Sequence, residues 1–429
     1  MADAVAAPSV ATHSAVLPNL DRIIRGLLYV YIFSLPFKRL LFIERNGFII
    51  LCVLLVLWCA VNRRHFFLRT PIDLPLLAFI AWVGFTVPFA TFPAYSSKEF
   101  AKLLQQGLIF YVVVYFVRDP VHRWRLVWML IGMLSIISLY GIWQFLTDVL
   151  PYAREGELAV IASFLPGEVW LTTYLVMLIP FCLAMALYEE SRSGRMVAWA
   201  GTVLGVITQV LAFSRAGILA LFLEVVVTAA IVKRRIVLIV AIALIACVGV
   251  GGELFFKASP RGGDGVGIVS ERKFDISNWV ARLNIWKYGL SKIPESPFVG
   301  FGYGKDNFYM VFGSETRKMH VPYRFEMPAG THNVFIDLAV GVGPVGLVLF
   351  VWVLGALAVE AYRAFQNSTD LFQRAPSLGL LLLIVGTVIR NSFDHMLVGS
   401  LAVLFWVLIA LALPLKASQE SVIYSPDIA

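Results

Sequence analysis

The sequence predicts an all-α integral membrane protein with about twelve transmembrane helices and one large, partly helical polar insert between the ninth and the tenth. The 429-residue chain is 59% hydrophobic and 14% charged, whereas globular domains carry about 25% charged residues. Apolar runs of roughly 17 to 25 residues recur throughout, and each is long enough to cross a bilayer. Such spans must be helices, because lipid offers backbone groups no partner and no segment alternates like a barrel strand.

The predicted spans follow one another through short loops, except around the insert. In chain order they cover residues 20–36, 47–62, 72–90, 100–117, 124–147, 169–188, 196–213, 216–232, 235–256, 334–362, 376–394 and 398–415. The chain then divides into a disordered cytoplasmic tail (1–19), spans 1 to 9 (20–256), the insert (257–331), a short rim helix with spans 10 to 12 (332–415), and a second cytoplasmic tail (416–429).

The loops after the even-numbered spans are basic, and this sets the predicted orientation. Arg63, Arg118, Arg192, Lys233 and Arg363 follow spans 2, 4, 6, 8 and 10. Cytoplasmic loops carry the excess of Lys and Arg in membrane proteins. Both termini are therefore predicted to be cytoplasmic, and the insert is predicted to face outward.

The charge of the insert needs a separate explanation. Residues 257–331 hold eleven Lys and Arg against seven Asp and Glu. An outward segment longer than about 60 residues escapes the charge bias of membrane insertion. Its basic residues therefore indicate an anionic ligand. The net charge of +8 does not indicate nucleic acid, since much of it lies in the cytoplasmic loops and is explained by topology and anionic lipid.

One helix is predicted inside the insert. Trp279, Leu283, Trp286 and Leu290 recur at helical spacing, which indicates an amphipathic helix lying on the membrane surface or on the spans. Arg282 falls at the boundary between its apolar and polar faces. The loop Gly300-Phe-Gly-Tyr-Gly304 follows. No strand–helix unit surrounds it, so it is not a nucleotide-binding fingerprint, and a simple turn is the favoured interpretation.

Three residues near the predicted outer rim are candidates for chemistry. His332 follows Thr331, a predicted N-cap, at the start of a short helix, and an imidazole there can act as a general base. The alternative is a histidine that only ties the insert to the spans. Arg215 and Arg282 suit a phosphate, because a guanidinium binds two oxygens at once. A lone arginine would instead be a membrane anchor, but two arginines with a histidine at one rim favour a binding site.

The remaining charged residues near the spans have weaker interpretations. Arg390 and Asp394 are four residues apart, so an ion pair on one helix face explains both. Asp394 is alternatively a partner that orients His332. Glu224 lies in mid-span and is a functional candidate by default, while the Glu155/Glu157 loop has no assigned role. No Asp-x-Asp or His/Cys cluster is present, so neither a metal nor a cofactor is expected.

At this point the pattern resembles a known family. Its motifs are a Ser-Arg-x-Gly turn (Ser214–Gly217), Arg-x-x-x-Trp (Arg282–Trp286), Pro-Phe-x-Gly-x-Gly (Pro297–Gly302) and His-Asn-x-Phe (His332–Phe335). In this order the motifs resemble the O-antigen ligase and polymerase superfamily of bacterial envelope glycosyltransferases. The resemblance covers roughly residues 200 to 350, and the first half of the chain is similar only in hydropathy.

The resemblance implies an inner-membrane enzyme of lipopolysaccharide biosynthesis with a periplasmic active site. Such an enzyme moves an O-antigen glycan from undecaprenyl pyrophosphate to the lipid A-core oligosaccharide, with no cofactor or metal. His332 corresponds to the family's essential histidine, and Arg215 and Arg282 to its essential arginines. Asn333, Asp394 and Trp286 are supporting candidates. A chain of this length without a large C-terminal outward domain favours a ligase.

Three other functions stay open. Within the superfamily, the alternatives are an O-antigen polymerase and a protein O-oligosaccharyltransferase. In a different class, the alternative is a transporter of lipid-linked sugars, which predicts deep charges and repeated halves. Glu224 is nearly the only deep charge, and no half-repeat is visible, so the enzyme is favoured.

Overall fold

The computed structural model describes residues 17–147, 161–232, 276–316 and 330–413. These ranges are helical, with no strand among them. The α-helices are α1 (Leu17–Ser34), α2 (Leu41–Asn62), α3 (Asp73–Thr86), α4 (Pro93–Phe116), α5 (Pro120–Thr147), α6 (Glu168–Tyr188), α7 (Arg192–Leu211), α8 (Arg215–Val232), α11 (Ile276–Lys292), α12 (Asn307–Thr316), α13 (Val334–Gly341), α14 (Gly343–Asn367), α15 (Leu371–Asn391) and α16 (Gly399–Ala412). Three short 3₁₀ helices lie at Lys38–Leu40, Val87–Phe89 and Ile293–Glu295.

Seven of the described helical segments are long and apolar enough to cross a membrane. They are Lys38–Asn62, Pro120–Thr147, Glu168–Tyr188, Arg192–Leu211, Arg215–Val232, Gly343–Asn367 and Gln373–Asn391. Two shorter apolar helices, Asp73–Phe89 and Gly399–Ala412, also coincide with predicted spans. The predicted span 235–256 lies outside the described residues, as do residues 257–275 and 317–329 of the insert. The total of about twelve spans therefore stays a prediction.

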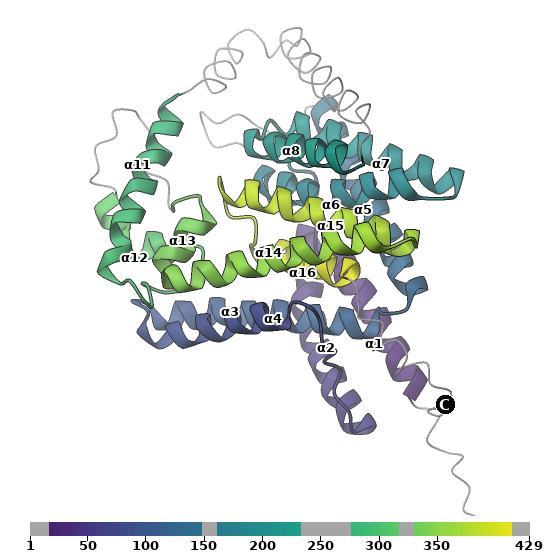
Figure 1. Ribbon diagram of the computed structural model, residues 1–429, viewed down its shortest axis with the longest axis horizontal. Coiled ribbons are helices and arrows are strands. Elements are labelled where there is room, and N and C mark those ends of the chain that lie inside the picture. Colours follow the sequence, from purple (N-terminus) through teal and green to yellow (C-terminus); the bar gives the residue numbers. More distant parts are fainter. Residues whose placement is uncertain (1–16, 148–160, 233–275, 317–329, 414–429) are drawn as a thin grey trace, which may run out of the picture.

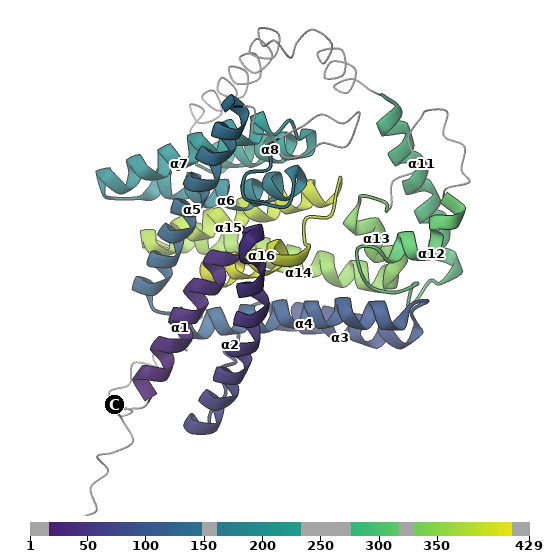
Figure 2. The same cartoon turned by 180° about the vertical axis from the view of Figure 1, so that it is seen from behind.

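The bundle is built around α6. Helices α4, α3, α14, α15, α7 and α8 run side by side in it, whereas α1 and α2 are inclined to them (Figures 1 and 2). Helix α6 is apolar on all sides and buried along nearly its whole length, from Leu171 to Ala186. It packs against α15, α7, α5 and α8. A helix with no polar face is stable only in such a position, enclosed by others.

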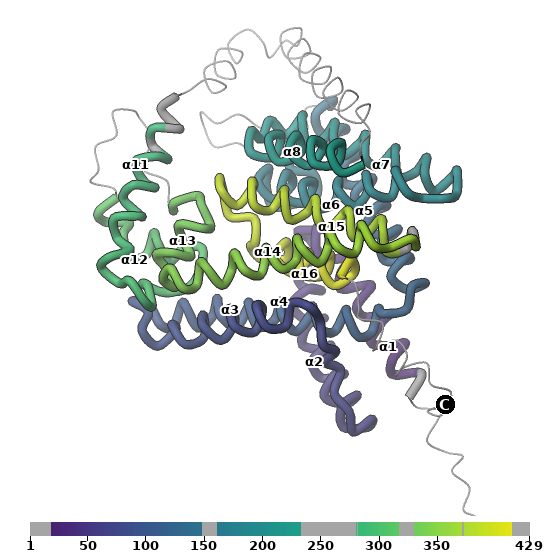
Figure 3. The backbone as a smooth tube through the Cα atoms, viewed as in Figure 1, coloured from purple at the N-terminus to yellow at the C-terminus, as the bar shows by residue number. Residues whose placement is uncertain are grey.

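Helices α11, α12 and α13 gather at one end of the bundle, which we call the capped end (Figure 3). Ile285 of α11, Phe308 and Phe312 of α12 and Val340 of α13 form a separate apolar cluster there. The predicted helix in the insert is confirmed, and Trp286 of its predicted apolar stripe packs against this cluster. Leu283 and Leu290 are half exposed, and the buried face centres on Ile285 and Gly289.

The glycine loop joins two backbone segments closely. Gly300, Gly302 and Gly304 all have positive φ. The amide of Gly302 donates to the carbonyl of Gly341 at 2.7 Å, and a Cβ on Gly300 would lie 2.3 Å from that same carbonyl oxygen. Only glycine fits such an approach in this conformation. The glycines therefore allow this close backbone packing, and they fix the end of α13.

The basic loops lie at the opposite end of the bundle. Helices α4 and α14 begin at the capped end and run away from it, ending near Arg118 and Arg363. Helix α7 runs the other way, from Arg192 toward the candidate site. Arg118, Arg192 and Arg363 thus lie toward one end of the bundle and the candidate site residues at the other, while the side of the membrane that each end faces stays a prediction.

Candidate functional site

Arg215 is placed by a tight turn between α7 and α8. Phe213 adopts positive φ, which ends α7 and reverses the chain. The Ser214 hydroxyl then accepts a hydrogen bond from the amide of Gly217 at 3.4 Å, capping α8. Gly217 is pressed against the buried side chain of Gln209. The motif Ser214–Gly217 therefore holds Arg215 at the first position of α8, where its side chain is exposed.

Arg282 comes from α11, across the capped end. Its Nη1 donates to the carbonyl oxygen of Phe393 at 2.5 Å, so α11 is tied to the loop between α15 and α16. Burial lowers the pKa of Arg282; the charge of Asp394 opposes this and that of Arg215 adds to it. Because the charge of Arg215 acts on Arg282, the two arginines lie near each other in space although they are 67 residues apart in sequence.

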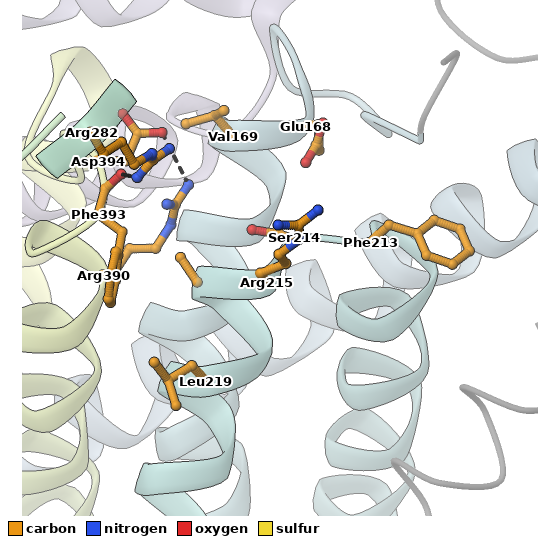
Figure 4. Close-up of a pocket in the computed structure, with 11 residues that line it drawn as sticks. Glu168, Val169, Phe213, Ser214, Arg215, Leu219, Arg282, Arg390, Phe393 and Asp394 are labelled. Carbon is orange, nitrogen blue, oxygen red and sulfur yellow. Dashed lines mark hydrogen bonds and ion pairs between the residues drawn. The ribbon is translucent and has the colours of Figure 1, made fainter. Parts of the chain in front are cut away.

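Both arginines line one pocket of about 360 Å³. Arg390 and Asp394 of the α15 end and Glu168 of α6 line it as well. Arg282, Arg390 and Asp394 lie together on one side of this pocket, and Arg215 lies opposite (Figure 4). We call it the arginine pocket. With three guanidinium groups against two carboxylates, its net charge is positive.

His332 stands immediately before α13 with positive φ, at 52°. The N-cap of α13 is Asn333, whose side chain accepts from the amides of Phe335 and Ile336 at 3.0 and 3.2 Å. The prediction of Thr331 as the cap was wrong, because Thr331 instead exchanges hydrogen bonds with the backbone of Asn333. The turn leaves the His332 side chain 35% exposed, and its Nδ1 lies 3.3 Å from Oδ1 of Asp394.

Asp394 is the residue where the two halves of the site meet. Burial by itself would raise its pKa, but the hydrogen bond with His332 and the charge of Arg390, whose Nη2 lies 3.6 Å away, lower it to about 2. Both interpretations made from the sequence are confirmed geometrically: Asp394 pairs with Arg390 and also contacts His332. The carboxylate is therefore ionised at neutral pH.

His332 lines a second pocket, of about 200 Å³, which we call the histidine pocket. Lys305, Asp306, His395 and Asp394 line it too. Asp394 and Val169 belong to both pockets. His332 therefore does not lie in the arginine pocket itself but in the adjoining one, with the Asp394 carboxylate between them.

The two other supporting candidates hold backbone in place. Nε1 of Trp286 donates to the carbonyl of Thr331 at 2.8 Å, next to His332. Nδ2 of Asn333 donates to the carbonyl of Ser392 at 3.2 Å, beside the segment that carries Asp394. Trp286 and Asn333 thus position the residues around His332, and neither lines the arginine or the histidine pocket.

Sequence reasoning missed several residues of the site. Glu168 and Lys305 line pockets, and His395 lies beside Asp394 with its Nε2 2.5 Å from Oδ2 of Asp337. The only sequence signal for this pair was that His395 is adjacent to Asp394. Glu224 is buried in α8 and lines neither pocket, and the Glu155/Glu157 loop lies outside the described residues.

The fold and the site together define a class of protein. Long apolar helices form a bundle, and a polar site of arginine, histidine and aspartate lies at its capped end, which indicates a multi-pass membrane protein. Residues 200–351 match the family model described as O-Antigen ligase, and this match supports assignment of the chain to the O-antigen ligase family. The matched segment contains Arg215, Arg282 and His332. No curated protein matches the chain. The match supports a glycosyltransferase-type enzyme of the ligase and polymerase superfamily.

Proposed function

We propose that this protein transfers an O-antigen glycan from undecaprenyl pyrophosphate to the lipid A-core oligosaccharide at the periplasmic face of the bacterial inner membrane. One observation carries the proposal. A pocket with three arginines and a pocket with an accessible histidine adjoin at Asp394. A glycosyl transfer needs these two environments side by side, one for an anionic leaving group and one for the hydroxyl that replaces it.

The arginine pocket is the donor side of this proposal. Arg215 and Arg282 approach it from different helices, so their guanidinium groups can bind different oxygens of one pyrophosphate. Each charge-assisted hydrogen bond of this kind contributes about 1.5 to 3 kcal/mol. The polyprenyl chain would lie along the apolar spans below. Partial burial of Arg282 strengthens its contact, because the local dielectric is lower than that of water.

The histidine pocket is the acceptor side. The Asp394 carboxylate accepts a hydrogen bond from Nδ1–H of His332. Nε2 is then left to take the proton of an acceptor sugar hydroxyl. The hydroxyl oxygen forms a bond to the anomeric carbon as the bond from that carbon to the pyrophosphate oxygen breaks. The electron pair leaves with the pyrophosphate, whose developing charge the arginines stabilise. A single displacement inverts the anomeric centre, and no metal is required.

A reconstituted assay with lipid-linked glycan and purified acceptor tests this mechanism. His332→Ala should abolish transfer while the protein stays inserted and monodisperse, and Arg215→Ala should raise the donor KM. His122→Ala is a matched control, because His122 also pairs with an aspartate, Asp119 at 2.7 Å, but lies at the start of α5. Near-normal transfer by His332→Ala would remove the histidine from the mechanism, and loss of transfer in EDTA that Mg²⁺ restores would refute metal independence.

The same assay separates the alternatives. An O-antigen ligase modifies the lipid A-core acceptor, a polymerase lengthens the lipid-linked glycan, and a protein oligosaccharyltransferase modifies a polypeptide. A transporter gives no product in detergent, where no second compartment exists. Product on the lipid A-core acceptor alone is the expected result.

A further inference from the structure

Two histidine–aspartate pairs join the start of α13 to the loop between α15 and α16. In one pair the α13 side supplies the histidine, and in the other it supplies the aspartate. His332, before α13, meets Asp394 in the α15–α16 loop (residues 392–398). Asp337, on α13, meets His395 in the same loop, with Nε2 and Oδ2 2.5 Å apart. Each segment therefore contributes one imidazole and one carboxylate. The first pair belongs to the proposed mechanism, whereas the second has no role in it.

The second pair is more deeply enclosed than the first. The side chains of His395 and Asp337 are 19% and 9% exposed, against 35% for His332. Nε2 of His395 and Oδ2 of Asp337 are in close contact, although the geometry is not that of a well-aligned hydrogen bond. A buried charge without its partner is strongly unfavourable, so the two side chains must stay together.

The electrostatic surroundings favour the charged form of His395. Burial lowers its pKa, but the carboxylate of Asp337 on α13 and that of Asp394 in the same loop raise it above its usual value, and Lys305 only partly opposes them. The raised pKa favours the protonated imidazole in this contact. His395 lines both the histidine pocket and a third pocket, and Asp337 lines the third pocket together with apolar residues such as Phe350 and Trp406.

We propose that Asp337 and His395 are positioning residues: their pairing holds the α15–α16 loop against α13 and thereby keeps Asp394 in contact with His332. The inference rests on the proposed function only for its kinetic consequence. Short backbone connections link this pair to Asp394 in the loop and to His332 before α13. The backbone amide of His395 donates to Oδ1 of Asp394 at 2.8 Å, and the amide of Asp337 donates to the carbonyl of Asn333 at 2.9 Å, one residue beyond His332.

Other contacts tie this loop mainly to α15: the amide of Asp394 donates to the carbonyl of Arg390 at 3.0 Å, and the amide of the buried Met396 donates to Oδ1 of Asn391 at 2.9 Å. Asn333 and Arg282 bind the carbonyls of Ser392 and Phe393. Beyond them, Asp394 contacts His332 at 3.3 Å and Arg390 at 3.6 Å, both of which are long for charge-assisted contacts. The His395 side chain joins the second half of the loop directly to Asp337 of α13. Without it, we expect Asp394 to leave the imidazole.

The kinetic test compares His395→Ala, His395→Gln and Asp337→Ala in the transfer assay. Both alanine variants should lower kcat about tenfold or more, because misplacement of a supporting group by about 1 Å has large effects on rate, while the donor KM stays near that of the wild type. The double variant should be no slower than either single one, since both remove the same contact. His395→Gln, whose amide can still donate to Asp337, should recover a large part of the rate, and His122→Ala should change nothing. Additive losses, or a Gln variant as slow as Ala, would overturn the proposal.

Hydrogen exchange tests the same inference without any glycan. In His395→Ala, amides of residues 392–398 should exchange about tenfold faster or more than in the wild type, as expected when a local contact is lost, while peptides from α6 are unchanged. His395→Gln should restore protection. Unchanged exchange at 392–398 in His395→Ala overturns the positioning role whatever the enzyme does. If the wild-type protein transfers no glycan but the exchange result holds, the proposed function fails and this inference stands.

Discussion

Replacement of Asp394 by asparagine isolates the charge at the junction of the two pockets. The folded protein lowers the pKa of Asp394 from 3.8 to about 2. One pKa unit corresponds to about 1.4 kcal/mol, so the ionised carboxylate is favoured in the folded state by about 2 kcal/mol. Asparagine has the same shape and no charge. Asp394→Asn should therefore lose about 2 kcal/mol of stability at neutral pH, and lose most transfer activity because the imidazolium formed on His332 loses its counter-charge.

The stability difference between the wild type and Asp394→Asn should depend on pH in a direction that the pKa shift sets. Because the pKa of Asp394 is lower in the folded protein, its contribution is present above the unfolded value, about 3.8, and disappears as the pH falls through about 2. Unfolding of both proteins in detergent should differ most at about pH 7 and progressively less toward about pH 3. Asp119→Asn, at the remote His122 pair, is the control for activity. Equal stability at neutral pH, or a difference that does not shrink in acid, would refute the electrostatic reasoning.

Three further substitutions test other parts of the site. Arg282→Lys should raise the donor KM nearly as much as Arg282→Ala, because an ammonium cannot reach the Phe393 carbonyl and a phosphate together; equal KM for Lys and wild type would contradict this. Trp286→Phe removes the hydrogen bond to the Thr331 carbonyl and should reduce kcat several-fold with an unchanged donor KM, so an effect on KM alone would argue against a positioning role. Gly300→Ala should lower the unfolding midpoint, since its φ is +68° and the new Cβ would meet a backbone oxygen; Gly355→Ala, with open space around it, is the matched control.

Much of the helical architecture was predictable because hydropathy alone determines where a chain can cross lipid. The predicted spans 124–147, 169–188 and 216–232 coincide closely with α5, α6 and α8. The predicted short rim helix corresponds to α13, which ends at the glycines around residue 342, where α14 begins. The packing face of α11 was not predictable in the same way. Leu283 is as apolar as Ile285, and only the positions of α12 and α13 decide which of them is buried.

The candidate site was predictable in its members more than in its arrangement. Arg215, Arg282 and His332 stand out in the sequence because charged and titratable residues are rare near apolar runs. That His332 lies in a pocket of its own, separated from the arginines by Asp394, depends on contacts across 62 residues of chain. The pairing of His395 with Asp337 depends likewise on how α13 meets the α15–α16 loop.

The amino-acid sequence by itself determined that this protein is a helical membrane protein with its polar residues concentrated at span ends, because the cost of placing charge and bare backbone in lipid acts locally on each segment. The tertiary structure alone decided which of those residues share a pocket and which carboxylate faces which imidazole. These contacts join residues far apart in the chain, so their geometry depends on helix packing, which local hydropathy does not encode.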